Sequence, residues 1–445
     1  MGNNLSQHAR DRIYLCKKDG ERELNLSSCD LKELPKRILK FRKTLTQLNV
    51  GKNFLTEFHN SIEKFQLLEG LVADSNELND VSASLSSLAH LTHLDLSNNL
   101  LTNVPNNMSH LTYLNISINS IQSFPNALSL PMLQELLYAH NKVSIFPTPI
   151  LELRHLRTLD LSGNRLNYLP DEISHLSATL HTLDLSENNF TSFPPPISTL
   201  SNLRTLRIGS NNMGTLTPVF TTLTHLETLD FSGCSLTSFD FDLSKLMSLT
   251  ELSLAHNRIP EFSVQTALSL GTLKKMKQLD LSAAGFNSIP KQIGWLTGLR
   301  RINLTQNNLT KVPGELSLLN PSIDILLVPN PLEYPYAEWI KEGIPIFLQN
   351  IRPYMKAYAP NCSVSDLQTQ LKVNTPNQFT ITAVDYAGQA RISGGDVFEV
   401  KMMLDGQGAS QAGETPAGAS FLKQIDCIVK DNFKAQKASH LHCIL

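Results

Sequence analysis

Five aspartates stand at the same place in a short phrase that recurs along the chain. They are Asp95, Asp160, Asp184, Asp230 and Asp280, and each follows a leucine. Catalysis by carboxylates needs an acid, a base and a pocket. A recurring phrase supplies only a stripe, in which each carboxylate is expected beside the next on neighbouring strands about 5 Å apart. We therefore expect hydrogen bonding along the stripe or recognition of a partner, and no enzyme.

The other motifs do not indicate an enzyme either. The sequence has no phosphate-binding glycine loop, nucleophile elbow, helical zinc histidine pair or kinase signature. His440, His442 and Cys443 together with Cys427 carry metal-binding groups, but their spacing matches no standard site. No metal and no cofactor is therefore expected. The six cysteines show no paired spacing, which is typical of a reducing compartment.

The N-terminus carries a modification pattern. In Met1–Ser6, removal of the methionine exposes Gly2 for myristoylation, and a serine follows four positions later. Gly2 is the predicted lipidation site, with a chance match as the alternative. One myristoyl chain anchors only marginally, so a second signal is needed. Four basic residues between Arg10 and Lys18 can supply it, or palmitoylation of Cys16, for which an unmodified position in a solvated cap is favoured.

Composition narrows the class of partner. The 445 residues carry a formal charge of −2, and 18% are charged. Nucleic-acid binding usually needs a basic surplus, so nucleic acid is not an expected partner. No apolar run approaches about 18 residues, and the start lacks the apolar region of a secretory signal. We expect a cytoplasmic protein, at the inner face of the plasma membrane if Gly2 is acylated.

The element that must position these residues is a strand repeated about every 23 residues. Its phrase places leucines at alternate positions and an asparagine shortly after, as in Leu159, Leu161 and Asn164. Alternate leucines face a core, and the asparagine can bond backbone groups where the strand turns away. The asparagine recurs at positions 53, 76, 99, 119, 141, 164, 188, 211, 257 and 307. Cys29 and Cys234 take its place in two copies, where buried thiols are expected.

The phrase resembles the leucine-rich repeat, which implies an α/β solenoid shaped as a horseshoe with short parallel strands on its concave face. Thirteen well-formed copies and a degenerate last one occupy residues 21–332, after an N-terminal segment at 1–20. The copy around Leu279 is long and has Ala284 in the asparagine position, so an irregular coil is expected there. Prolines in the return segments, such as Pro170 and Pro290, favour extended turns over long helices.

The return pattern Leu169–Leu176 resembles the Ras-group intracellular leucine-rich-repeat proteins, which include Ras-pathway scaffolds and the repeat region of fungal adenylate cyclase. The resemblance covers roughly residues 20 to 355. Residues 333–357, with Ile346, Leu348 and Ile351, resemble the amphipathic C-terminal cap of that class. The resemblance implies a small GTPase of the Ras type, its effector or a phosphatase as the partner.

A different pattern begins near residue 358. Residues 374–388 alternate apolar and polar side chains, and further candidate strands follow at 397–404 and 424–429. They resemble part of a filamin-type immunoglobulin repeat over 358–433, with a loop at 405–420 and a tail at 434–445. The partial match leaves three alternatives: a truncated or altered reading frame, a partial fold completed by the solenoid or a second chain, or a disordered remnant.

The predicted partner-binding residues lie on the concave face. Tyr113, Ile118, Leu137 and His140 are expected to form an apolar spot bordered by charge. Charged side chains follow in later copies, namely Asp160, Asp184, Arg207, Asp230, Glu251 and Arg301. Repeat surfaces of this shape suit protein ligands, so the sequence predicts an adaptor or scaffold, by resemblance in Ras-type signalling. The alternatives are an actin-cytoskeleton protein acting through the filamin-like element, and a regulatory subunit of a phosphatase or cyclase.

Overall fold

The computed structural model describes residues 5–58, 60–80 and 83–354, followed by the backbones of five separate strands nearer the C-terminus. Gly2 lies outside the described residues. So do most of the positions that carry the filamin-type pattern, including the loop predicted at 405–420.

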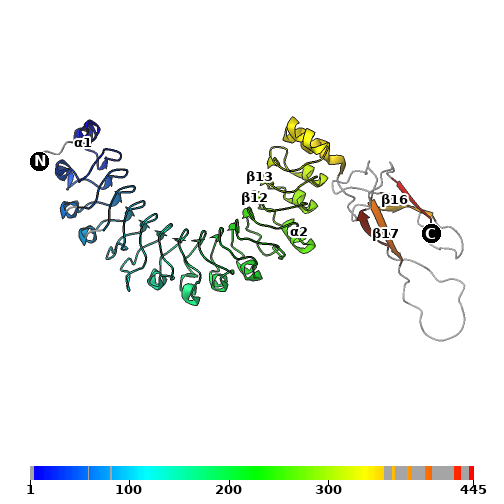
Figure 1. Ribbon diagram of the computed structural model, residues 1–445, viewed down its shortest axis with the longest axis horizontal. Coiled ribbons are helices and arrows are strands. Elements are labelled where there is room, and N and C mark those ends of the chain that lie inside the picture. The colour runs from blue at the N-terminus through cyan, green and yellow to red at the C-terminus, as the bar shows by residue number, and fades with distance from the viewer. Residues whose placement is uncertain are drawn as a thin grey trace.

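The repeat region is one curved array whose inner wall is a parallel sheet of 14 strands (Figure 1). The strands pair in sequence order, one for each predicted copy, the degenerate last copy included. They are β1 (Glu23–Asn25), β2 (Gln47–Asn49), β3 (Gly70–Val72), β4 (His93–Asp95), β5 (Tyr113–Asn115), β6 (Glu135–Leu137), β7 (Thr158–Asp160), β8 (Thr182–Asp184), β9 (Thr205–Arg207), β10 (Thr228–Asp230), β11 (Glu251–Ser253), β12 (Gln278–Asp280), β13 (Arg301–Asn303) and β14 (Asp324–Leu326). The predicted horseshoe is confirmed.

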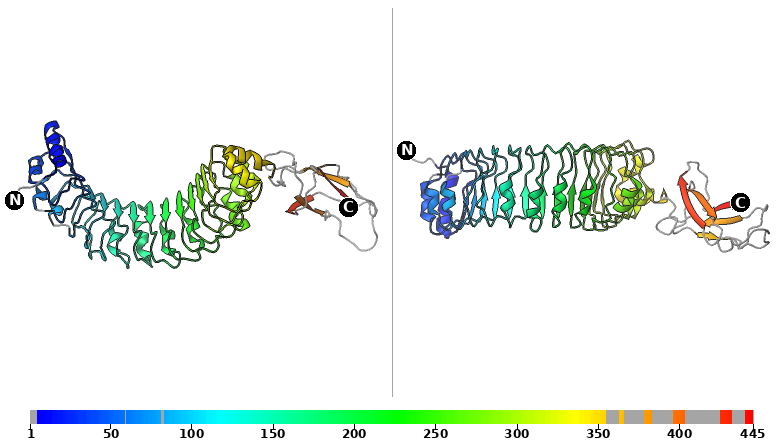
Figure 2. Two further views of the ribbon diagram at one scale, coloured as in Figure 1. Left: turned by 45° about the horizontal axis from the view of Figure 1, so that its top comes forward. Right: turned by 90° about the horizontal axis from the view of Figure 1, so that it is seen from below.

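Each strand has three residues, and the pleat fixes their roles. The middle residue, a leucine or in β13 and β14 an isoleucine, is buried, whereas the first and third mostly face outward. The register aligns middle with middle throughout, as in the pairing of Leu183 with Leu206. The array therefore has one core, in which each coil covers its neighbours, and an inner surface with two rows of side chains. Figure 2 shows the coils stacked side by side along the array.

The return segments form the convex side. Most contain one short 3-10 helix: η1 (Lys36–Phe41), η2 (Asn60–Lys64), η3 (Ala83–Ser87), η4 (Thr148–Glu152), η5 (Asp171–Leu176), η6 (Pro195–Thr199), η7 (Pro218–Thr222), η8 (Lys291–Trp295) and η9 (Gly314–Leu318). Pro170 and Pro290 precede two of them with extended backbone angles, as the return pattern predicted. The long coil before β12 instead holds an α-helix, α2 (Val264–Leu270), so the predicted irregularity is confirmed.

Both ends of the array are covered. Helix α1 (Gln7–Asp19) begins at Ser6, whose hydroxyl accepts a hydrogen bond from the amide of Ala9, and it buries Ile13 and Cys16. The other end is closed by α3 (Tyr336–Trp339), η10 (Ile340–Glu342), α4 (Ile344–Ile351) and η11 (Arg352–Tyr354). In α4 the buried residues are Phe347, Leu348 and Ile351. Of the three cap residues quoted for the resemblance, Leu348 and Ile351 are buried and Ile346 is 44% exposed.

Five strands are described beyond the array. Strand β16 (Gln378–Thr382) pairs antiparallel with β15 (Ser363–Ser365) and with β19 (His440–Ile444), and β17 (Asp396–Met402) pairs antiparallel with β18 (Ile425–Asp431). The three strands predicted there are therefore present, and β19 lies in the predicted tail. The filamin-type identity of this region stays a prediction.

Candidate protein-binding surface

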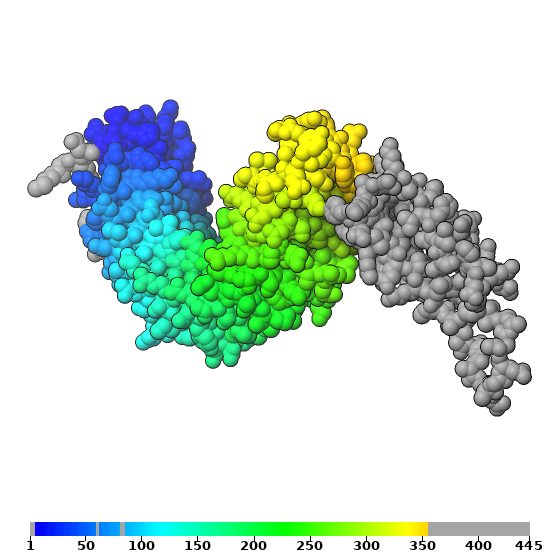
Figure 3. Space-filling view, turned by 45° about the vertical axis from the view of Figure 1, so that its right-hand side comes forward, coloured from blue at the N-terminus to red at the C-terminus, as the bar shows by residue number. Residues whose placement is uncertain are grey.

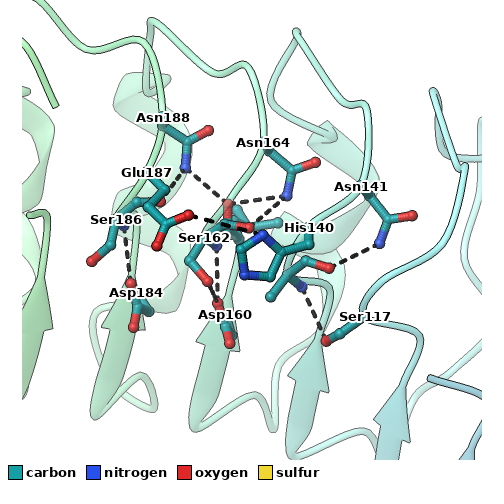
Figure 4. Close-up of polar contacts among 12 residues, drawn as sticks. Ser117, His140, Asn141, Asp160, Ser162, Asn164, Asp184, Ser186, Glu187 and Asn188 are labelled. Carbon is teal, nitrogen blue, oxygen red and sulfur yellow. Dashed lines mark hydrogen bonds and ion pairs between the residues drawn. The ribbon is translucent and has the colours of Figure 1, made fainter. Parts of the chain in front are cut away.

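The ten recurring asparagines, together called the asparagine ladder below, form buried hydrogen bonds to the backbone. Asn164 donates from Nδ2 to the carbonyls of Tyr138, Leu161 and Ser162, each at 3.1 Å, and its Oδ1 accepts from the amide of Val143 at 3.1 Å. Figure 4 shows Asn164 in line with Asn141 and Asn188 of the neighbouring coils. All ten asparagines are at most 8% exposed. Because each satisfies backbone groups of its own coil and of the coil before it, the ladder fastens neighbouring coils together.

The two cysteines in the ladder keep part of this pattern. The Cys234 amide donates to Oδ1 of Asn257, and its Sγ lies 3.4 Å from the carbonyl oxygen of Ile208. Cys29 makes the same amide contact with Asn53. Both thiols are free and buried, as expected. Burial raises the pKa of Cys234 to about 12, opposed by a backbone hydrogen bond and raised a little further by Asp230.

The residue just before each ladder position adopts a left-handed backbone conformation. This holds in every coil from Cys29 to Asn307, including Ile118 with φ 56° and His140 with φ 50°. These two predicted binding residues therefore lie at the turn that follows the strand, away from the two strand rows. At the same position Gly163 leaves room for the His140 ring, which reaches across it towards Glu187 (Figure 4).

The aspartate stripe caps the ends of its strands. Oδ1 of Asp160 accepts from the amide of Ser162 at 2.9 Å and from its hydroxyl at 2.7 Å, and Asp184 accepts from the Ser186 amide at 2.9 Å (Figure 4). Asp95, Asp230 and Asp280 make the same contact two residues on. These side chains hold the turn, as aspartates and asparagines commonly do.

The aspartates are not consecutive neighbours, so that expectation was wrong for most of them. Only Asp160 and Asp184 are directly opposed. Arg207 stands between Asp184 and Asp230, and Ser253 between Asp230 and Asp280. Burial raises the pKa of Asp184, while hydrogen bonds from Ser186 oppose the shift, Asp160 adds to it and Arg207 reduces it.

The predicted apolar spot is divided. Tyr113 and Leu137 lie on adjacent strands, both partly buried, but the residue opposite Leu137 is Asn115. Tyr113 instead stacks on His93 of β4, with ring centroids 4.0 Å apart and planes 7° apart. Burial raises the pKa of Tyr113, and nearby Asp95 raises it further. The sequence reasoning missed His93, although both aromatic residues are the first residue of a strand.

The charged residues predicted in the later copies do gather in one place. Arg207, Asp230, Glu251 and Arg301 line a hollow on the concave face over β9–β13, together with Ser253, Gln278 and Asp280. Its volume is about 200 Å³. Figure 3 shows the wider concavity between the two arms of the array. Asp160 and Asp184 lie outside the hollow, on β7 and β8.

Other features of the described residues bear on function. They hold no group of three or more histidine, cysteine, aspartate or glutamate side chains placed to bind a metal ion. Among them, no helix combines the length and apolar character needed to cross a bilayer. The expectation of a solvated Cys16 was wrong, because α1 packs this side chain against the array and leaves it 2% exposed. It is therefore not accessible to palmitoylation in the folded protein. Arg12 donates to the carbonyl of Ser27 at 2.8 Å and so secures α1 on the first coil.

Comparison with known proteins agrees with the fold. Residues 120–322 match the model of the leucine-rich repeat region, and residues 90–111 match that of a single leucine-rich repeat. The solved structure of a leucine-rich-repeat protein of Leptospira interrogans superposes with a TM-score of 0.62 at 30% identity, covering 72% of this chain and 81% of that one.

Two curated relatives are larger. Podocan-like protein 1 of Mus musculus is 29% identical over 338 residues, 68% of this chain and 59% of its own length. Adenylate cyclase of Schizosaccharomyces pombe is 24% identical over 292 residues, 65% of this chain and 16% of its own length. The chain thus spans less than two thirds of either relative.

Proposed function

Because the chain belongs to the leucine-rich-repeat proteins, we propose that its concave face binds a protein partner and that the chain is an intracellular adaptor without catalytic activity of its own. The observation that carries the proposal is the aligned array of 14 strands, which presents two rows of side chains over a continuous inner surface. Such a surface matches an extended protein ligand better than a small molecule. The free, buried thiols of Cys29 and Cys234 suit a reducing compartment.

The partner class that we propose is a Ras-type GTPase, its effector or its phosphatase. Support comes from the return pattern at Leu169–Leu176, which resembles the Ras-group repeats, and from the fungal adenylate cyclase among the relatives. A regulatory role towards a phosphatase or a cyclase is the alternative within the same class, since either enzyme would occupy the same face.

The test is affinity capture of the full chain with purified Ras-type GTPases in both nucleotide states. Two charge reversals on the concave face, Arg207→Glu and Glu251→Lys, should reduce capture at least about tenfold, because like charges then oppose the partner. The matched control reverses an ion pair on the convex side, Arg154 with Glu152, whose side chains lie 3.2 Å apart. Loss of capture in the control alone would refute concave binding, and no capture of any GTPase would refute direct binding of a Ras-type GTPase.

A second candidate function rests on the paired strands beyond the array. Antiparallel strands such as β17 and β18 can accept a further strand from a partner, which is how filamin-type repeats bind peptides. We propose an actin-linked role for this region as the alternative. Co-sedimentation with actin filaments should then require residues 358–445, whereas equal sedimentation of a chain that ends at Lys356 would refute it.

Membrane contact is a separate proposal. Myristoylation of Gly2 would hold the adaptor at the inner face of the plasma membrane only marginally, and the buried Cys16 cannot supply the second lipid. The exposed residues Lys17 and Lys18 of α1 remain as a source of attraction to anionic lipid. The test is the mass of the N-terminal peptide of protein expressed in eukaryotic cells. An acyl adduct that is absent from the Gly2→Ala variant would support the proposal, and an unmodified N-terminus would refute it.

A further inference from the structure

The strands of the array are much more acidic than the chain as a whole. Their residues include nine carboxylates and two arginines, a formal charge of −7, whereas the chain carries −2. The carboxylates are Glu23, Asp95, Glu135, Asp160, Asp184, Asp230, Glu251, Asp280 and Asp324. Basic residues lie on the edge that enters the strands, such as Arg157, Arg204 and Arg300. A partner that covers the two strand rows therefore has to offer basic groups to them.

The hollow over β9–β13 concentrates this charge. In the row of third residues, Asp230 and Asp280 flank Ser253 on either side. Glu251 stands on the same strand as Ser253, in the row of first residues. With strands about 4.8 Å apart, the two aspartates stand about 10 Å from each other, with the small serine side chain between them. The three carboxylates thus border one opening that a long side chain can enter.

Asp230 and Glu251 have acceptor capacity left, whereas Asp280 already accepts three hydrogen bonds through its two oxygens. Asp230 uses one oxygen for the amide of Ser232, at 2.8 Å. Glu251 accepts two long contacts, from Gln278 Nε2 at 3.3 Å and from Thr228 Oγ1 at 3.5 Å. Within the described part of the array, none of the three carboxylates forms an ion pair. A cation placed between them would supply the missing charge and donors.

Two arginines stand at the ends of the hollow. Arg301 is paired with Asp324 at 3.4 Å. Arg207 is exposed, and within the described residues its guanidinium has no hydrogen-bond or ion-pair partner. A free guanidinium beside an acidic opening matches a ligand that carries both signs of charge, a carboxylate next to a basic group.

We propose that this hollow receives one lysine or arginine side chain of a protein partner, with its cationic end between Asp230, Glu251 and Asp280. An acidic residue of the same partner segment contacts Arg207. The inference rests on the proposed function of the concave face and names the chemistry of the segment that binds there. Arginine fits better than lysine, because its planar group can donate to two carboxylates at once.

The experiment selects displayed random peptides on the full-length protein and measures the recovered peptides by fluorescence anisotropy in about 150 mM salt, where distant charges are screened. The variants are Glu251→Gln and Asp280→Asn. The second keeps the turn contact, since Asn303 makes the same bond to the amide of Thr305 at 3.2 Å. The matched control is Asp95→Asn, which removes the same charge from the same row about 38 Å away along the sheet, eight strands from Asp280.

The expected result is peptides with a basic residue next to an acidic one. Their Kd should rise about tenfold in each hollow variant and less than about twofold in Asp95→Asn. Replacing the basic residue of the peptide by neutral citrulline should raise the Kd for the wild-type protein about tenfold as well. The same replacement should not raise the Kd further for the hollow variants, which indicates a direct contact between the two groups. Arg207→Gln should weaken the same peptides about threefold.

Other outcomes separate this inference from the proposed function. Peptides that lose binding with Tyr113→Ala but not with Glu251→Gln would leave concave binding intact and overturn the hollow. Peptides whose binding changes with neither Tyr113→Ala nor Glu251→Gln would overturn both the binding at the hollow and the binding at the concave face. Selected peptides without basic residues, or no selected peptide at all, would also overturn the inference.

Discussion

The His140 imidazole lies 4.0 Å from the Glu187 carboxylate, Nδ1 to Oε2, although one whole coil separates the two residues. The contact exists because the coil between them has Gly163 at the equivalent position. A Cβ built on that glycine would stand 2.2 Å from Nδ1 of the imidazole. One missing side chain therefore lets two exposed turns reach each other across a third.

Gly163→Ala should destabilise the array by about 2 kcal/mol, because alanine must adopt φ 63° and its methyl group collides with His140. The measurement is the denaturant midpoint. Gly233→Ala is the matched control, since it has the same φ but its nearest contact is 3.3 Å away, so it should cost about 1 kcal/mol. Adding His140→Ala should restore about half the loss. Equal losses at both glycines would contradict the collision.

Asn164→Ala should cost about 3 kcal/mol, because it removes four hydrogen bonds and leaves the buried amide of Val143 without a partner. The three carbonyls that Asn164 contacts each keep one other hydrogen bond. Hydrogen exchange should show the loss first in the coils on either side of residue 164. Asn189→Ala, at an exposed asparagine outside the ladder, should change stability by no more than about 0.5 kcal/mol. A similar small change at Asn164 would mean that water replaces the ladder.

Asp184→Asn should leave the stability unchanged or raise it by up to about 1 kcal/mol, since asparagine can still accept from the Ser186 amide, as Asn115 does from Ser117. Burial raises the pKa of Asp184 in the folded protein above its value in the unfolded chain. The side chain therefore contributes most stability below the unfolded-state pKa, and this contribution is lost as pH rises through the folded-state pKa. The difference between wild type and variant should therefore shrink on acidification. Growth of that difference would contradict the direction of the shift.

Cys234 should resist alkylation at neutral pH in the folded protein and react once the array is unfolded, because its thiol is buried and its pKa is raised to about 12. Because the pKa of Cys234 is raised in the folded protein, its contribution to stability is complete below the ordinary thiol pKa. This contribution is lost progressively as pH rises towards 12. One unit above the ordinary pKa, wild type should lose about 1.4 kcal/mol relative to Cys234→Ala. The alanine is tolerated at the same place in the coil of Ala284, which makes the comparison fair.

Ile118→Asn should stabilise the protein by about 1 kcal/mol, because a β-branched residue is held at φ 56° and its side chain is 51% exposed. Asn98 occupies the equivalent place in a neighbouring coil with φ 52°. If Ile118 is a binding residue, capture of the partner should fall while stability rises. A loss of both would point to a packing role instead.

The predictable part of the fold follows from contacts that each copy makes in the same way. The buried leucines, the asparagine ladder and the prolines of the return segments are repeated local solutions, so one copy such as Leu159–Asn164 predicts the rest. The long spacing around Leu279 predicted an irregular coil, but not that this coil would hold the α-helix α2. The predicted binding residues lie together only in part. One hollow contains Arg207, Asp230, Glu251 and Arg301, whereas the turns after the strands contain Ile118 and His140.

The sequence by itself determined the period, the number of strands and which face of each strand is buried, because these depend on one coil and the next. Only the tertiary structure decided which charges are neighbours. Asp160 meets Asp184, but Arg207 and Ser253 separate the aspartates that follow. Side chains on adjacent strands are about 23 residues apart in sequence, and coils of unequal length change that spacing. The register of the strands therefore sets the electrostatic pattern that a partner would meet.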